Sequence, residues 1–176
     1  MYTIRKGTQQ DIDTIEGIYD RILTQEEAGQ SAVGWVRDIY PTRATAQAAL
    51  DAGELFVLEH GGAVAAAARI NQIQVPEYAN ARWQHPQAPA EQEMELHTLV
   101  VDPLQGGKGL GTALVRFYED YARENGCPYL RMDTNQRNAS ARALYARLGY
   151  QEAGIVDCRF NGISGVRLVC LEKTLA

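Results

Sequence analysis

The chain has 176 residues, of which 45% are hydrophobic and 22% charged, and its formal net charge is −5. This length suits a single domain, residues 1–176, with a sizeable core, and the acidic balance argues against general nucleic-acid binding, which needs a basic surface. No apolar run approaches the ~20 residues that span a bilayer, and Met1–Lys6 lacks a secretory apolar segment, so we expect a cytoplasmic protein without a membrane partner.

The predicted elements alternate between strands and helices along the whole chain. We expect a strand over 2–6, a helix over 11–28 capped by Thr8, and a second helix over 42–52. A hairpin follows, with strands over 54–59 and 63–71, and then a strand over 94–101, a helix from 110 to 126, a strand over 129–134 and a helix that begins at 138. Strands over 151–160 and 165–175 form a last hairpin. This order predicts an α/β fold with about seven strands and four helices.

The segment from Val100 to Thr112 carries the most specific pattern. An apolar strand ends at Asp102-Pro103, and a loop with glycines at 106, 107, 109 and 111 leads into a helix. Glycines let backbone N–H groups converge, and the first helical turn adds unpaired N–H groups with partial positive charge. The combination predicts a pyrophosphate seat. Gly109 after Lys108 excludes a Walker loop, and Thr112 departs from the dinucleotide fingerprint.

A second pattern runs from Asn138 to Tyr150. Asn138 is a good helix N-cap, and Gly149 stands where a left-handed C-terminal residue belongs. Leu144 and Leu148 share one helical face, which puts Tyr145 at the edge of the buried side. The Tyr145 hydroxyl can therefore reach a ligand, although the residue also suits a purely structural place at the edge of the core.

Two segments resemble motifs of the GNAT N-acetyltransferase superfamily, and they occur in the same order as in that family. They are the strand–Asp-Pro–Gly-x-Gly-x-Gly–helix segment and the Asn-x-x-Ala-x-x-Leu-Tyr-x-x-x-Gly-Tyr series. The resemblance covers essentially the full chain, with specific motifs in these two segments. It implies a mixed sheet whose fourth and fifth strands splay apart, and an acetyl group carried by acetyl-CoA to a primary amine.

The resemblance also implies how acetyl-CoA is held. Its pyrophosphate would meet the backbone of the loop, and its pantetheine would lie along the fourth strand, with Asn138 and Ala141 beside the CoA arm and the Tyr145 hydroxyl near the thioester sulfur. The implied cofactor-binding residues on the strand and loop are Leu99, Val100, Val101, Gly106, Gly107, Lys108, Gly109, Leu110, Gly111 and Thr112. One departure is that Gly106 stands where the family usually has Gln or Arg, with Gln105 one place early.

Candidate general bases lie on the predicted central strand. Alternation puts Glu93, Glu95 and His97 on one face, and Leu96, Thr98 and Val100 on the other. The family often uses a carboxylate on this strand, so Glu95 is our first choice of base and His97 the second, with Tyr145 as the proton donor. A β-bulge would change this parity.

Direct attack of the amine in a ternary complex is the expected route. A covalent acetyl-cysteine route is disfavoured, since Cys127, Cys158 and Cys170 lie near neither motif, and their spacing predicts no metal site.

Two loose segments carry aromatic residues. Residues 72–92 contain three prolines and few aliphatic side chains, and precede the central strand, so they could cover an acceptor pocket. Trp83 from this segment, with Trp35 and Tyr40 from the first interhelical stretch, are candidate acceptor-binding residues. The alternative is that these aromatics anchor loops to the body of the protein.

Two functions without catalysis also fit the sequence: an acyl-CoA-binding sensor, and a peptide-docking module whose open sheet gap binds an extended chain. Within the enzymes, the acceptor is either a small-molecule amine or a peptide amine. A homodimer is possible.

Overall fold

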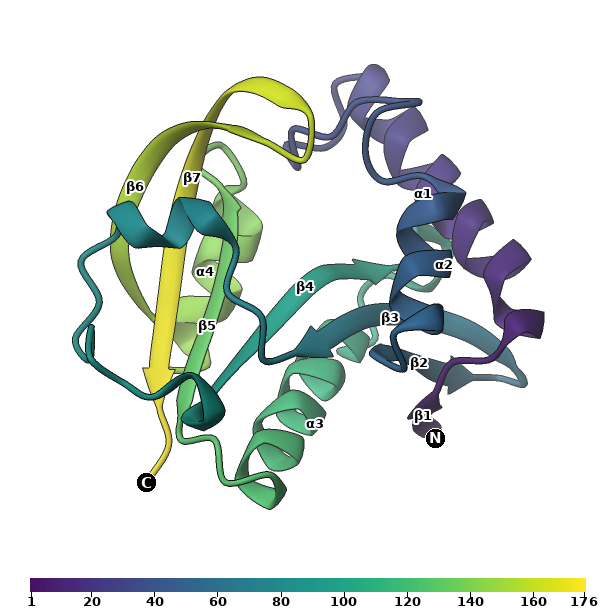
Figure 1. The fold of residues 1–176 in the computed structure, drawn as a ribbon. Helices are drawn as coiled ribbons and strands as arrows, with labels where there is room; N and C mark the ends of the chain where they lie inside the picture. The colour runs from purple at the N-terminus through teal and green to yellow at the C-terminus, as the bar shows by residue number, and fades with distance from the viewer.

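The sheet has seven strands in the order β1-β2-β3-β4-β5-β7-β6, and the computed structural model describes all residues, 1–176 (Figure 1). The strands are β1 (Tyr2–Lys6), β2 (Leu55–His60), β3 (Ala63–Asn71), β4 (Glu93–Val101), β5 (Tyr129–Asn135), β6 (Gln151–Phe160) and β7 (Ile163–Thr174). The helices are α1 (Ile12–Glu27), α2 (Arg43–Asp51), α3 (Leu110–Glu124) and α4 (Ala139–Arg147). The predicted fold class is confirmed.

The two central strands, β4 and β5, are the only parallel neighbours and they diverge. Their pairing covers only Glu93–Glu95 against Tyr129–Arg131. Beyond these residues the strands separate, as Figure 1 shows, and β5 stays paired with β7 while β4 stays paired with β3. The predicted splay is therefore present, and it opens a gap in the middle of the sheet.

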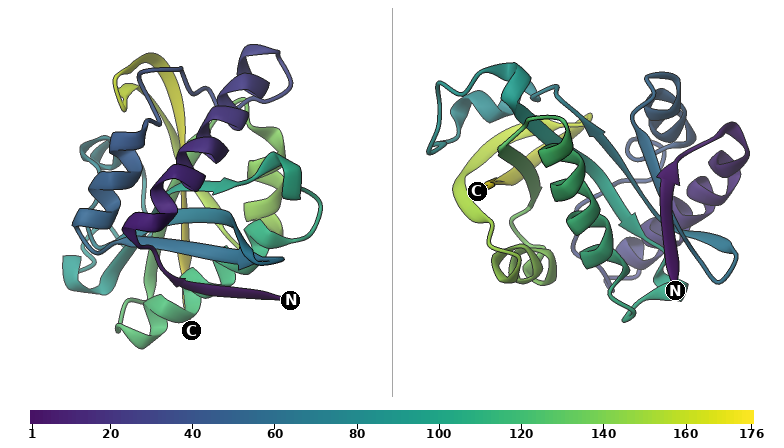
Figure 2. Two further views of the ribbon diagram at one scale, coloured as in Figure 1. Left: turned by 90° about the vertical axis from the view of Figure 1, so that its right-hand side faces the viewer. Right: turned by 90° about the horizontal axis from the view of Figure 1, so that it is seen from below.

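Helices cover both faces of the sheet on the β1–β4 side of the gap (Figure 2). Alternation along β2 explains this: Val57 packs in one core cluster with Ile15 of α1, whereas Phe56 and Leu58 pack in another with Leu114 of α3. The α3 cluster continues across the gap, because α4 contributes Tyr145 to it, the residue after α4 contributes Leu148, and β7 contributes Val169 and Leu171. None of these helices has the length and apolar character needed to cross a bilayer.

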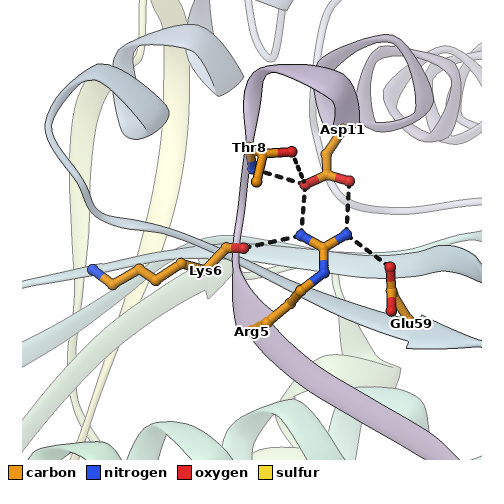
Figure 3. Close-up of polar contacts among 5 residues, drawn as sticks. All are labelled: Arg5, Lys6, Thr8, Asp11 and Glu59. Carbon is orange, nitrogen blue, oxygen red and sulfur yellow. Dashed lines mark hydrogen bonds and ion pairs between the residues drawn. The ribbon is translucent and has the colours of Figure 1, made fainter.

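A polar cluster fixes the entry into α1 (Figure 3). Arg5 donates to both oxygens of Asp11, at 2.8 and 2.9 Å, and to Glu59 on β2 at 2.7 Å. The Thr8 backbone N–H donates to Asp11 Oδ2 at 2.7 Å. A short 3-10 turn, Gln9–Asp11, therefore precedes α1, so Thr8 caps this turn rather than the first turn of the helix.

The segment 72–92 lies elsewhere than we expected. It forms two short 3-10 turns, Pro76–Asn80 and Ala90–Gln92, and its buried Tyr78 and Trp83 pack against apolar side chains of β6 and β7. The segment thus covers the outer face of the β5–β7 half, because that face has no helix to bury it. Only Ile73 and Val75 from this segment reach the cavity beside the gap.

Candidate active site

The glycine loop before α3 presents a continuous row of free backbone donors. The amides of residues 107–112 have no hydrogen-bond partner within the protein, because the first helical bond is donated by Ala113 to the Gly109 carbonyl. Gly107 and Gly109 have φ values of 76° and 73°, in the left-handed region that favours glycine. The loop and α3 therefore fit a pyrophosphate group, with partial positive charge from the helix behind the donors.

Asp102 holds this loop against α1. Its carboxylate accepts two hydrogen bonds from Arg21, at 2.9 and 2.8 Å, and one from the Leu104 amide at 3.0 Å. The Asp-Pro turn is visible in the sequence, but the role of Arg21 is not, because it lies 81 residues away. Lys108 is exposed, and its ammonium donates to Gln105 Oε1 at 2.7 Å.

A β-bulge at Thr98 changes the direction of side chains along β4. Thr98 has a φ of 51°, and the register with β3 shifts between Ala67 and Arg69. Up to His97 the alternation is as predicted. Beyond the bulge, Val100 packs with the α1 cluster while Leu96 packs with the α3 cluster, so the prediction that they share a face is wrong.

Two cavities meet at the splayed strands. One of about 1050 Å³ runs along the glycine loop, and one of about 530 Å³ lies between β4, β5 and the α1–α2 loop. The residues that line both are Val33, Trp35, Leu99, Asn138, Ala141 and Tyr145. The predicted loop residues and Val100 and Val101 line the larger cavity, so the two sequence motifs come together here.

The second motif supplies the wall at this junction. Asn138 caps α4, since its Oδ1 accepts a hydrogen bond from the Ala141 amide at 3.2 Å. The Tyr145 ring packs edge-on against Tyr150 with centroids 6.0 Å apart, and its hydroxyl has no partner within the protein. Burial raises the pKa of Tyr145 well above its usual value, so the hydroxyl keeps its proton at neutral pH.

The candidate bases on β4 lie in different environments. Glu93 pairs with Arg131 at 3.1 Å. Glu95 is fully buried, neither of its oxygens has a hydrogen-bond partner, and it lines neither cavity. Burial, with a smaller contribution from Glu93, raises the pKa of Glu95 to about 8. Our first choice of base therefore does not face the cavity, whereas His97 does.

Neighbours of His97 fix its tautomer. The Asn71 amide nitrogen donates to Glu54 at 2.9 Å, so Asn71 Oδ1 faces His97 Nε2 at 2.8 Å and also accepts from the Ile73 amide. His97 Nε2 must then carry the hydrogen, and Nδ1 is the unprotonated nitrogen of the neutral ring. Burial lowers the pKa of His97 to about 4, so the ring is neutral at neutral pH.

A carboxylate that sequence reasoning missed lies across the gap from β4. Asp133 on β5 lines the smaller cavity, and its Oδ2 accepts a hydrogen bond from the buried Tyr78 hydroxyl at 2.6 Å. Burial raises the pKa of Asp133 to about 6. No sequence signal marks this residue, since its position matters only once β5 leaves β4 and Tyr78 comes in from the covering segment.

The three candidate acceptor residues separate into two groups. Trp35 and Tyr40 line the smaller cavity with their rings edge-on at 5.7 Å, and Tyr40 is hydrogen-bonded to Thr98. Trp83 lines neither cavity: its indole N–H donates to the Tyr78 carbonyl at 2.8 Å, and its ring packs against the Arg131 guanidinium. The proposal of Trp83 as an acceptor residue is corrected, because it anchors the covering segment instead.

Comparison with known proteins agrees with this geometry. The model of the acetyltransferase (GNAT) family matches residues 18–150. The chain belongs to this family. It is 43% identical over 81 residues to the N-alpha-acetyltransferase RimI of Mycobacterium tuberculosis, a match that covers 46% of this chain and 49% of that protein. The chain thus matches about half the length of this curated relative.

Solved structures of the family share the fold over almost the whole chain. A GNAT-family acetyltransferase from Streptococcus agalactiae superposes with a TM-score of 0.83 at 20% identity, covering 99% of this chain and 96% of that one. The structure of yncA from Salmonella typhimurium, determined with its cofactor acetyl-CoA, superposes with a TM-score of 0.72 at 20% identity, covering 100% of this chain and 95% of that one.

Proposed function

We propose that the protein transfers the acetyl group of acetyl-CoA to a primary amine, by direct attack in a ternary complex. The observation that carries this proposal is the meeting of two cavities at Tyr145: one begins at a row of free backbone amides, and the other holds polar groups suited to an amine. Membership of the acetyltransferase family supports the same chemistry.

Each part of the site has a role in binding the cofactor. The amides of residues 107–112 would hold the pyrophosphate, and the edge of β4 at Leu99–Val101, which has no strand partner on the gap side, would hold the pantetheine arm. Asn138 and Ala141 lie beside this path. Acetyl-CoA, when bound, supplies a thioester whose carbonyl carbon is open to a nucleophile.

His97 and Tyr145 carry the proton transfers. The amine nitrogen attacks only when it is neutral, and the His97 ring, which lines the cavity, can accept a proton from that nitrogen as the C–N bond forms. The Tyr145 hydroxyl donates a proton to the sulfur as the C–S bond breaks, since it remains protonated at neutral pH. No cysteine lines either cavity, which agrees with a direct route.

A thiol-release assay with a panel of amines tests this function. We expect CoA release that depends on the amine, together with a mass increase of one acetyl group on the amine. An acyl-CoA sensor would bind acetyl-CoA in calorimetry without such release. A peptide-docking module would bind extended peptides in the absence of CoA, and either result would overturn the proposal.

A further inference from the structure

Asp133 is a carboxylate with no cation beside it. It takes part in no ion pair, and its only hydrogen bond is the one that Oδ2 accepts from Tyr78. Its Oδ1 has no hydrogen-bond partner within the protein. This oxygen is not fully buried, since the only fully buried side-chain oxygens without a partner are those of Glu95. A carboxylate withdrawn from bulk water is normally paired with a cation or fully hydrogen-bonded. The unpaired Oδ1 of Asp133 departs from this rule, which indicates that a positively charged partner comes from outside the protein.

The cavity beside Asp133 offers no such cation. Arg69, which also lines this cavity, is bound to Glu54 at 2.5 Å. His97 is neutral, and the remaining wall is mainly apolar or aromatic. The principal apolar residues of this wall are Trp35, Tyr40, Ile73, Val75, Phe160 and Ile163. One negative group in an apolar chamber suits a molecule with one positive end and an apolar body.

Two loops close the chamber over the splayed strands. Figure 1 shows the β6–β7 turn reaching the α1–α2 loop, and a Cβ built on Gly162 in this turn would lie only 3.2 Å from Ile39 Cγ2. At Gly34 the same loop packs against the side chain of Asn135 on β5, so that an added Cβ would have to displace the Asn135 amide. The chamber meets solvent at Ala48 of α2, at Ile73 and at Asn161 of the β6–β7 turn, which line it and are exposed. The turn and the loop thus bridge the splayed strands and narrow the room for an extended peptide.

We infer that the acceptor is a small primary amine with a mainly apolar body, bound in this chamber, with its ammonium group paired to Asp133 Oδ1. This inference rests on the proposed function and specifies its substrate class. Tyr78 acts as a positioning residue, because its hydroxyl holds Oδ2 and so directs Oδ1 toward the chamber. Before attack, one ammonium N–H bond breaks and its proton passes to Asp133 Oδ1, because the pKa of this carboxyl is raised to about 6 whereas that of His97 is lowered to about 4.

The test compares ligands that differ in charge or size. Butylamine, hexylamine, octylamine and 2-phenylethylamine are titrated calorimetrically into the CoA-loaded protein, and the same amines are assayed for acetyl transfer from acetyl-CoA. Hexanol and 2-phenylethanol serve as uncharged matches, and trialanine serves as a peptide amine. We expect the amines to bind about 10- to 100-fold more tightly than the alcohols, the size of a hydrogen-bonded charge pair. Trialanine should be neither bound nor acetylated.

Asp133→Asn should remove this preference. Amine affinity and kcat/KM are expected to fall about 10- to 100-fold, while the affinities for hexanol and acetyl-CoA stay unchanged. Asp157→Asn is the matched control, because Asp157 is an exposed carboxylate of β6 paired with Arg167; it should change none of these values. The amine–alcohol comparison on the unaltered protein remains decisive if Asp133→Asn fails to fold.

Any of four results would overturn the inference: equal binding of amines and alcohols, no binding of any amine, acetylation of trialanine as efficient as that of hexylamine, or full amine affinity in folded Asp133→Asn. The proposed function fails separately. Amines that bind in an Asp133-dependent way and are never acetylated would refute the enzyme and leave the binding site intact.

Discussion

The two cavities that meet at Tyr145 are built from different parts of the chain. The glycine-loop cavity presents backbone N–H groups from six consecutive residues, with helix α3 behind them. The smaller cavity, the proposed acceptor site, is lined by side chains from α1, α2, α4, six strands from β2 to β7, and two loops. The first site thus depends on a local backbone conformation, and a side chain added to one of its glycines should block it. The second site depends on which side chains converge, and the loss of a functional group from one of them should impair it.

Adding a carboxylate to the backbone site should have the largest effect. Gly109→Asp places a negative side chain where phosphate is expected, and we expect acetyl-CoA affinity to fall by at least about 100-fold in calorimetry. Gly62→Asp, in the β2–β3 turn, is the matched control. Its φ of 83° and open surroundings resemble the 73° and open surroundings of Gly109, so both variants carry the same backbone strain.

Retained affinity in folded Gly109→Asp would show that the loop is not the seat of the cofactor. Lys108→Ala should change the affinity much less, since this exposed ammonium adds only a charge screened by salt.

Removing one oxygen at the junction should affect turnover and spare binding. Tyr145→Phe keeps the ring packed against Tyr150 and deletes only the hydroxyl, the proposed proton donor. Loss of a general acid typically costs about 100-fold or more in rate, while stability should change by about 1 kcal/mol or less. Single-turnover rates and acetyl-CoA calorimetry measure the two effects. Full turnover, with chemistry shown to limit the rate, would refute the role of Tyr145.

His97→Gln probes the base on the acceptor side. We expect turnover to fall about 100-fold with unchanged acetyl-CoA affinity. Because the pKa of His97 is lowered to about 4, its ring is already deprotonated above that pH, so His97 should add no inflection near 6.5 to the wild-type pH–rate profile. His60→Gln, on β2 outside both cavities, is the control. Full activity in His97→Gln would show that water or another group, and not His97, accepts the proton of the amine.

Glu95→Gln should leave both cavities unchanged and alter stability in a pH-dependent way. The pKa of Glu95 is raised to about 8 in the folded state from about 4.5, so this carboxyl disfavours folding progressively as pH rises from 4.5 to 8. Glu95→Gln removes that dependence, and its melting temperature should exceed that of wild type increasingly toward pH 8.

Glu152→Gln should show no such gain, since Arg142 lowers the pKa of that carboxyl. A melting-temperature difference for Glu95→Gln that is flat between pH 5 and 9 would contradict the raised pKa of Glu95.

The backbone site was predictable because its information is local. Glycine spacing specifies the loop conformation, and Asn138 and Gly149 mark the ends of α4 where the structure has them. The acceptor site was not, because it depends on tertiary structure. No residue type announces the bulge at Thr98, since a β-branched residue rarely adopts a positive φ.

Asp133 illustrates the same limit on the other strand. In the sequence, Asp133 is indistinguishable from any other polar residue of a strand. Its place in the cavity depends on the divergence of β5 from β4 and on a hydrogen bond from Tyr78, which is 55 residues away in sequence. Trp83 was misassigned because the destination of the covering segment cannot be read from its composition.

The short pairing of β4 with β5 makes the sheet sensitive to what lies between them. Three residue pairs join the two halves, and the backbone groups of β4 that point into the gap have no strand to meet. Amide hydrogens there should exchange quickly with deuterium in the free protein and slow down when CoA occupies the gap. A ligand at 100 times its Kd adds about 2.7 kcal/mol to stability. Deuterium uptake along Leu99–Val101 would then report occupancy residue by residue, with the cofactor serving as the missing strand.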